Sequence, residues 1–311
     1  MVQKRFSRII KDIEYICRYR EVNDNNLNAL QDERLYFSTP SNFNDPYDNL
    51  IYANTFQIVN EIIGNIVNGM DSYLEKQRIL DKWETQYMRF LWGEERRDTT
   101  LLKHSELIVS CIDEIRTAIK NNTKIICFSK KYDSMLMWLH YANNHKGFCL
   151  VYAKKNIEEA TCFDRFNEVT SVRTKLLPVE YVDKQVDMTK EILQFIRYNK
   201  LENMGDIPYV NAEISASKLR RVLTEKSNDW SYEEEWRLIP RIPSIEKESP
   251  LCYVKCKPKA LILGSQCVLD DRTKITAICE KIGVPVYGIF LSESSPDFKL
   301  FVNEDGNTDI A

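Results

Sequence analysis

The sequence lacks an apolar run long enough to cross a membrane, because charged and polar residues interrupt each hydrophobic stretch well before about 20 residues. The first residues, Met-Val-Gln-Lys-Arg-Phe-Ser-Arg, are basic and then amphipathic. They are not followed by the apolar segment and small-residue cleavage site of a secretory signal. We therefore expect a protein that is neither exported nor anchored in a membrane.

Paired cysteine spacings are also missing, although the chain has nine cysteines. The number is odd and the residues are scattered, which argues against both a disulfide framework and a metal knuckle. Several cysteines lie within apolar, strand-like runs, where cysteine acts as a small buried side chain. We expect reduced thiols, a cytoplasmic location and no bound metal.

An excess of basic residues is absent too, since the formal net charge is -3. No global positive field exists to attract a nucleic acid, so any polyanion would have to be held by a local group. Hydrophobic residues at 43% and charged residues at 29% indicate a globular chain and not a disordered one. Without repeats or low-complexity tracts, we predict a single domain over residues 1–311.

The pattern of elements predicts an α+β fold, because strand pairs and helix blocks occur without regular alternation. Helical periodicity is strongest over about residues 56–121, which we interpret as a helical insertion. We expect shorter helices near the start, around Leu27 and Leu30, at 135–141 and over much of 188–223. We expect strands at residues 14–20, from 34, and at 124–129, 147–153, 176–182, 233–239, 251–256, 260–263 and 286–291.

Two groups of polar residues accompany the first strands. Arg18 and Arg20 would share one face of a strand and Tyr19 the other. Two guanidiniums on one face either suit a phosphate or carboxylate or mark a solvated strand end without a ligand. The following strand runs into the loop Ser-Thr-Pro-Ser-Asn-Phe-Asn-Asp-Pro-Tyr-Asp, which is dense in hydrogen-bonding side chains. This loop is either a network of Asx turns or one side of a binding cleft.

Two further groups lie later in the chain. On a helix, Trp138 and Tyr141 would be neighbours and could form an aromatic wall for a flat ring or could be core residues. His140 and His145 are five residues apart, a poor spacing for a shared metal. In Tyr-Glu-Glu-Glu-Trp-Arg, a strand would place Glu233 and Glu235 on one face. There they either call for a cationic partner, such as the Arg18 and Arg20 face or Arg237, or for a ligand hydroxyl, or they form a solvated acidic edge strand.

Three motifs, Asn-Phe-Asn-Asp-Pro-Tyr-Asp, Met-Trp-Leu-His-Tyr-Ala and Tyr-Glu-Glu-Glu-Trp-Arg-Leu, resemble those of the bacterial domain-of-unknown-function family 2971. The resemblance spans most of the chain. A second, more distant resemblance is to ADP-ribosyltransferases, which have an early basic residue, a Ser-Thr element and a later Glu-x-Glu. Here Arg18 or Arg20, then Ser38-Thr39-Pro40, and then Glu233 to Glu235 follow one another in that order.

The second resemblance implies a mixed, mainly antiparallel split β-sheet and a cleft for NAD as substrate. It implies an enzyme of toxin or phage-defence type that modifies a protein, RNA or DNA, with a possible antitoxin or chaperone partner. A fixed carboxylate would stabilise the positive charge that develops on the ribose as nicotinamide leaves. The implied catalytic residues are Glu235, Glu233, Arg18 and Arg20, and the implied NAD-binding residues are Tyr19, Ser38, Thr39, Asn44, Asp45, Trp138, His140 and Tyr141.

Two alternatives remain open on the sequence. In a metal-dependent nuclease or hydrolase, Asp45, Asp48, Glu233 and Glu235 would hold Mg²⁺ or Mn²⁺ through oxygen ligands. In a non-catalytic nucleotide or nucleic-acid binding module, the aromatic residues would stack a base and the arginines would hold phosphate. The transferase interpretation predicts one cleft that gathers all four polar groups.

Overall fold

The fold is described from a computed structural model of the chain. The structure describes residues 5–58, 60–61, 78, 100–199, 215–243, 248–291, 296 and 298–303. Most of the helical insertion expected over about 56–121 lies outside these residues. Within its described part, α5 (Thr100–Asn122) is a long helix.

The described residues form a mixed α+β fold built on an open, mainly antiparallel sheet of eight strands in the order β13-β12-β11-β4-β1-β3-β9-β6. Only β11 and β12 pair in parallel within it. The bounds in chain order are β1 (Tyr15–Arg20), β3 (Ile126–Ser129), β4 (Phe148–Ala153), β6 (Thr174–Pro178), β9 (Glu235–Pro240), β11 (Ala260–Leu263), β12 (Val286–Leu291) and β13 (Leu300–Val302).

Two small sheets complete the strand content of the described residues. One has the order β2-β10-β5, from β2 (Arg34–Tyr36), β10 (Tyr253–Lys255) and β5 (Cys162–Phe163). The other pairs β7 (Glu180–Val182) in parallel with β8 (Glu225–Ser227). The single strand expected over 176–182 is therefore two strands, β6 and β7, which belong to different sheets.

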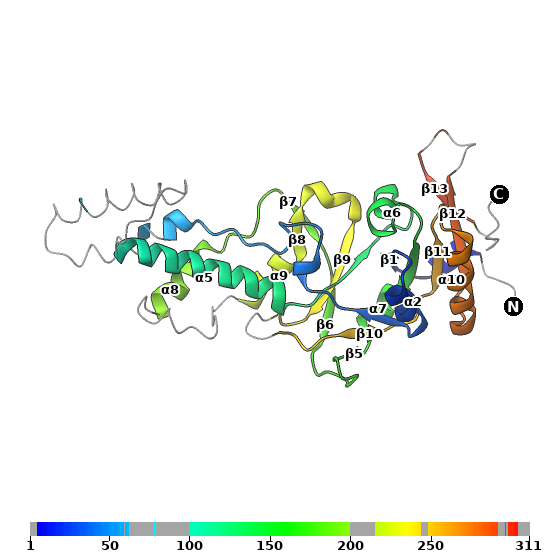
Figure 1. Cartoon of the computed structure of the whole chain (residues 1–311), viewed down its shortest axis with the longest axis horizontal. Coiled ribbons are helices and arrows are strands. Elements are labelled where there is room, and N and C mark those ends of the chain that lie inside the picture. Colours follow the sequence, from blue (N-terminus) through cyan, green and yellow to red (C-terminus); the bar gives the residue numbers. More distant parts are fainter. Residues whose placement is uncertain are drawn as a thin grey trace.

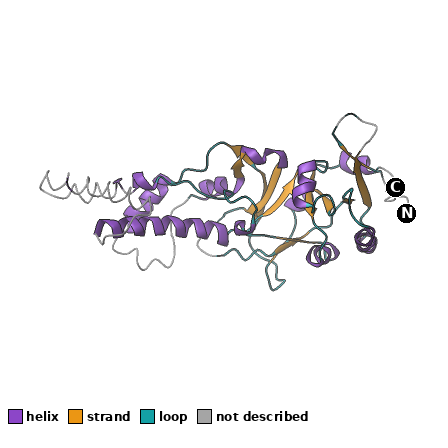
Figure 2. Cartoon of the chain, turned by 45° about the horizontal axis from the view of Figure 1, so that its top comes forward, coloured by secondary structure: helices purple, strands orange, loops and turns teal. Residues whose placement is uncertain are grey.

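Helices cover both faces of the large sheet and one of its ends (Figures 1 and 2). One face packs its apolar residues with α2 (Asp24–Gln31), α7 (Lys154–Glu158) and α10 (Leu269–Ile282), and the other with α1 (Phe6–Lys11) and α6 (Met135–Tyr141). A third core cluster joins α5, α8 (Thr189–Asn199) and α9 (Ala216–Thr224). Figure 1 shows α5 and α8 at the opposite end of the molecule from α10 and β13.

The centre of the sheet opens between β1 and β3. Strand β1 pairs with β4 over all six of its residues, but it pairs with β3 only where Cys17 faces Ser129. On its other side, β3 pairs with β9 along its whole length, and there Ser129 faces Glu235. The residues of β1 that follow Cys17 therefore have no β3 partner, and their side of the strand is free to line a cavity.

Local sequence explains two elements beside this opening. The side chain of Asn23 accepts a hydrogen bond from the Asn26 backbone N–H and begins α2. The strand expected over 233–239 begins only at Glu235. Residues Asn228–Glu233 form a 3₁₀ helix (η3), and Glu234 adopts a left-handed conformation with φ of 43° between the two elements.

Candidate functional site

A cavity of about 870 Å³ occupies the opening between β1 and β3. Its lining includes residues from all four polar groups, as a ligand cleft would require. Among the lining residues are Arg18, Arg20, Ser38, Asn44, Asp48, Ser129, His140, Tyr141, Lys226, Glu233 and Glu235. Segments far apart in the sequence therefore meet at one concave site.

Two arginines form the β1 side of the cavity. Arg18 is 7% exposed, and its guanidinium lies 5.8 Å from the centroid of the Phe128 ring. Its Nη2 donates to the Tyr36 carbonyl at 3.2 Å, while Nε and Nη1 are buried and have no hydrogen-bond partner within the described residues. Burial lowers the pKa of both Arg18 and Arg20. A buried guanidinium with unused donors is costly unless an anion binds it.

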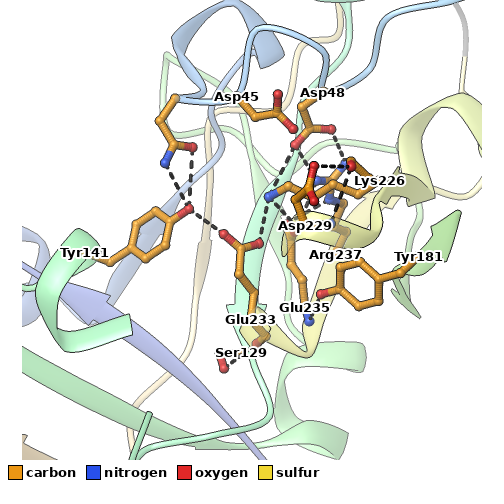
Figure 3. A network of polar contacts seen from close by, with 12 residues as sticks. Asp45, Asp48, Ser129, Tyr141, Tyr181, Lys226, Asp229, Glu233, Glu235 and Arg237 are labelled. Carbon is orange, nitrogen blue, oxygen red and sulfur yellow. Dashed lines mark hydrogen bonds and ion pairs between the residues drawn. The ribbon is translucent and has the colours of Figure 1, made fainter. Parts of the chain in front are cut away.

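A buried ion network forms the β9 side, with Arg237 at its centre (Figure 3). Arg237 is fully buried, and its guanidinium donates to both Glu235 oxygens at 2.8 and 2.9 Å. It also donates to the two Asp48 oxygens at 2.9 and 2.6 Å, and to the Leu223 carbonyl at 2.9 Å. The planar fork of arginine suits two carboxylates at once, so Arg237 ties the polar loop that follows β2 to strand β9.

Lys226 is the second cation of this network. Its Nζ lies 2.6 Å from Glu233 Oε2, 3.4 Å from Glu235 Oε2 and 3.7 Å from Asp48 Oδ2. Three carboxylates thus share two cations, which leaves the network with a formal charge of -1. All five of these side chains are buried. A buried net negative charge beside a cavity favours a cation, or a positive charge that develops during a reaction.

The two glutamates differ in their electrostatic environment. Burial alone would raise the pKa of Glu235, but Arg237 and Lys226 outweigh burial and lower this pKa to about 2. For Glu233, burial raises the pKa above its usual value although Lys226 opposes the shift. Glu235 is therefore charged at neutral pH, while Glu233 is the carboxylate whose protonation a ligand changes more easily.

Tyr141 connects Glu233 to the polar loop. Its hydroxyl donates to Glu233 Oε1 at 2.6 Å and accepts from the Asn44 side-chain nitrogen at 3.1 Å. Burial raises the Tyr141 pKa, and the negative charge of Glu233 adds to the shift. The hydroxyl therefore keeps its proton. Figure 3 shows Tyr141 reaching toward Glu233 from the opposite side to Lys226.

The turn at Glu234 explains why Glu233 and Glu235 both reach Lys226. Strand alternation was expected to place them on one face, but Glu233 ends η3 and does not belong to the strand. The left-handed Glu234 lies between them, and its carbonyl accepts a hydrogen bond from the Lys130 backbone. Ser129 fixes the same turn, because its hydroxyl donates to the Glu233 carbonyl at 2.6 Å.

Four of the expected NAD-binding residues are not placed as a role in NAD binding requires. Trp138 is fully buried, does not line the cavity and donates from Nε1 to the Tyr132 carbonyl, so it is a core residue in this structure. Tyr19 borders the cavity, but its ring packs edge-to-face against Trp138 at 5.1 Å. Thr39 and Asp45 are not among the lining residues. The expected aromatic wall therefore reduces to Tyr141, with His140 beside it.

Lys226 is the site residue that the sequence analysis missed. It lies in the short segment Glu-Lys-Ser, seven residues before Glu233, and nothing in that segment marks it as a partner for buried acids. The unusual density of acidic residues over 233–235 was the available signal, since buried carboxylates require a cation. The other cation, Arg237, lies two residues after Glu235 in the sequence and contacts it in the structure.

The carboxylates that a metal-dependent mechanism would use are already engaged. Asp48, Glu233 and Glu235 contact Lys226 Nζ or the Arg237 guanidinium, and Asp45 lies outside the main cavity. Within the described ranges, no group of three or more His, Cys, Asp or Glu side chains is arranged to hold a metal ion. The donor set therefore resembles an ion-pair network more than a metal site.

Comparison with known families gives one match, in which residues 137–238 fit the family described as "Protein of unknown function (DUF2971)". Residues 137–238 of the chain are therefore similar to the DUF2971 family. The matched DUF2971 segment contains Tyr141, Lys226, Glu233, Glu235 and Arg237, whereas the arginines of β1 and the polar loop precede it. No curated protein and no solved structure matches the chain.

The described part of the chain has no helix that is long and apolar enough to span a membrane.

Proposed function

We propose that this chain is an ADP-ribosyltransferase-like enzyme that binds NAD in the cavity between β1 and β3. One observation carries the proposal: the same cavity has the buried Arg18 and the partly buried Arg20 on one side and a buried network of net negative charge on the other. NAD has the complementary pattern, because its diphosphate is anionic and its nicotinamide ring is cationic.

Arg18 and Arg20 would hold the diphosphate. Both side chains are on β1 and line the cavity, and no ion pair links either of them to a carboxylate in the described part of the chain. The unused Nε and Nη1 of Arg18 supply donors in the planar geometry that phosphate oxygens accept. Binding of an anion would remove the cost of keeping these groups buried.

The size of the opening also suits a dinucleotide. Ligand pockets of roughly 300–1,000 Å³ take drug-sized molecules, and the cavity, at about 870 Å³, is near the upper end of this range. At the position where β1 pairs with β3, Cys17, Ser129 and Glu235 lie side by side on β1, β3 and β9. Two strand spacings of about 4.8 Å separate β1 from β9 there, so one extended ligand can contact both walls.

In the proposed reaction the bond between ribose C1′ and the nicotinamide nitrogen breaks, and its electron pair leaves with neutral nicotinamide. The positive charge moves to the ribose, where a nucleophile of the acceptor then adds at C1′ and loses its proton. Glu233, on the cavity wall, would stabilise the charged ribose more than the neutral one. Glu235 would act with Arg237 and Lys226 as a positioning group, because its oxygens are engaged by these cations.

The acceptor in this proposal is a nucleophile on a protein or a nucleic acid. Such an activity would suit a bacterial toxin or a phage-defence effector. The formal net charge of -3 means that a nucleic-acid acceptor would have to bind through a local groove.

The test is nicotinamide release from NAD, measured under magnesium-free conditions for the wild type, Glu233→Gln and Glu234→Gln. Glu234 is the matched control, because its side chain forms a surface ion pair with Lys131 and does not line the cavity. We expect a loss of about 100-fold or more in Glu233→Gln, as for removal of one electrostatic group at a reaction centre. No release by a folded wild-type protein, or equal rates in both variants, would refute the proposal.

A further inference from the structure

A second cavity of about 340 Å³ lies on the other side of Lys226 from the main one. Lys226 lines both, and Asp45 and Trp230 line only the second. The remaining lining comes from the segment after β7, from α9, β8 and η3, and from the loop around Asp45. The Asn-Asp-Pro-Tyr-Asp loop therefore contributes to both cavities: Asn44 and Asp48 line the main one, and Asp45 and Tyr47 line the second.

The charged lining of the second cavity is mainly acidic. Its acids are Asp45, Asp183, Glu225 and Asp229, and its bases are Lys184 and Lys226. Lys226 is engaged by the carboxylates of the main cavity, and Glu225 pairs with Arg221. The remaining charged residues, Asp45, Asp183, Asp229 and Lys184, give a net charge of -2. This balance favours a cationic occupant.

Asp45 supplies the independent sign of a ligand. It is 5% exposed, and its Oδ1 accepts the Tyr47 backbone N–H at 2.9 Å. Its Oδ2 is buried and has no hydrogen-bond partner within the described residues. Gln185, which also lines this cavity, has an equally unpartnered and buried Nε2. The cavity thus has one unpaired acceptor and one unpaired donor, and a ligand with both a donor and an acceptor would pair with them. Such pairing is favourable because unmade buried hydrogen bonds carry a cost.

We infer that the second cavity binds an arginine residue of a protein or peptide. The guanidinium would donate to Asp45 Oδ2, and a main-chain carbonyl of the same residue would accept from Gln185 Nε2. Tyr47 and Trp230 add aromatic surface to the lining, on which a guanidinium packs well. A cavity of about 340 Å³ is at the low end of the range for small ligands, roughly 300–1,000 Å³, and suits one side chain with its peptide groups.

This inference does not depend on NAD, because the second cavity is tested with its own probe. The probe is N-acetyl-arginine amide, titrated into the full chain by calorimetry or ligand-observed NMR without NAD. N-acetyl-citrulline amide is the matched ligand, since it has the same shape but no charge. We expect the arginine probe to bind saturably and at least about tenfold more tightly than citrulline, as a charge-assisted hydrogen bond implies.

Asp45→Asn is the variant that tests the site. Its Oδ1 can still accept from the Tyr47 backbone, so the turn is retained while the charge is lost. Asp164→Asn is the control, because Asp164 Oδ1 accepts from the Phe166 and Glu168 backbones in a similar turn outside the cavity. We expect about tenfold weaker binding in Asp45→Asn and no change in Asp164→Asn.

Three results would overturn the inference: no saturable binding, equal binding of arginine and citrulline, or unchanged binding in Asp45→Asn. If Asp45→Asn does not fold, as judged by circular dichroism, Asp229→Asn takes its place. Asp229 is an exposed lining residue, and we expect its loss to weaken arginine binding by about threefold through the reduced negative charge. Unchanged binding in that variant would equally overturn the inference.

Discussion

The replacement Lys226→Met tests whether the buried ion network is as tightly balanced as its contacts indicate. Methionine keeps the unbranched shape of the side chain and removes its charge. Glu233 would then lose the cation that lies 2.6 Å from its Oε2, and the network would change from a net charge of -1 to -2. Removing one partner of a buried pair costs about 3–5 kcal/mol, because the remaining charge stays buried. We expect a loss of that size at pH 7.

The effect should depend on pH in a defined direction. The carboxylates around Lys226 raise its pKa against the effect of burial, so its contribution is complete at neutral pH and is lost only in strongly alkaline solution. In Lys226→Met, no lysine opposes the effect of burial on the pKa of Glu233. This carboxyl will therefore take up a proton as the pH falls. The loss of stability should therefore be smaller at pH 5 than at pH 7.

Urea unfolding at 25 °C, followed by circular dichroism at pH 7 and pH 5, measures both quantities. Lys131→Met is the matched control, because Lys131 pairs with Glu234 at 2.7 Å while both side chains are about two-fifths exposed. Surface pairs contribute about 0–1 kcal/mol, so the control should change little. A loss of stability below about 1 kcal/mol in Lys226→Met, or an equal loss at the two pH values, would show that the buried ion network does not depend on Lys226 in this way.

Three further predictions concern the same region. Glu235→Gln should be less stable than the wild type at pH 7, and the difference should shrink as the pH falls. The pKa of Glu235 is lowered to about 2, so its ionised carboxylate stabilises the fold above about pH 4.3 and this stabilisation is lost toward pH 2. Acid titration of the wild type and the variant checks this. Tyr141→Phe should cost about 1.5–3 kcal/mol in urea unfolding, because it removes the hydroxyl that donates to Glu233, whereas Tyr47→Phe, with an exposed side chain, should cost nothing measurable. Gly147→Ala should cost about 1–3 kcal/mol or more in thermal unfolding, because its Cβ would lie 2.1 Å from the Arg20 carbonyl oxygen.

Local patterns sufficed to predict many elements of the fold. Helix α6 and strands β11 and β12 have the predicted bounds, because each is a short segment of strong local preference between turn residues. Helix α10 and the small strands β5 and β13 were not predicted. In α10, charged residues dilute the apolar periodicity, and β5 and β13 have only two and three residues.

The site could be predicted only in part, for physical reasons. The four polar groups were recognised because each concentrates side chains that a core does not need, and the cavity brings members of all four together. The contacts inside the site depend on tertiary structure: Asp48 and Arg237 are 189 positions apart. The left-handed turn at Glu234 was also not readable, because a non-glycine residue adopts that conformation only where surrounding contacts hold it.

Calorimetric titration of NAD into the wild type, Arg18→Met and Arg165→Met shows whether Arg18 serves a ligand and not the fold. Arg165 is exposed, so its variant controls for loss of positive charge. We expect saturable NAD binding by the wild type and Arg165→Met, and its loss in Arg18→Met, with no loss of stability because a buried guanidinium with unused donors is removed. Absence of NAD binding by the folded wild type, or unchanged binding in Arg18→Met, would contradict a role of Arg18 in binding NAD.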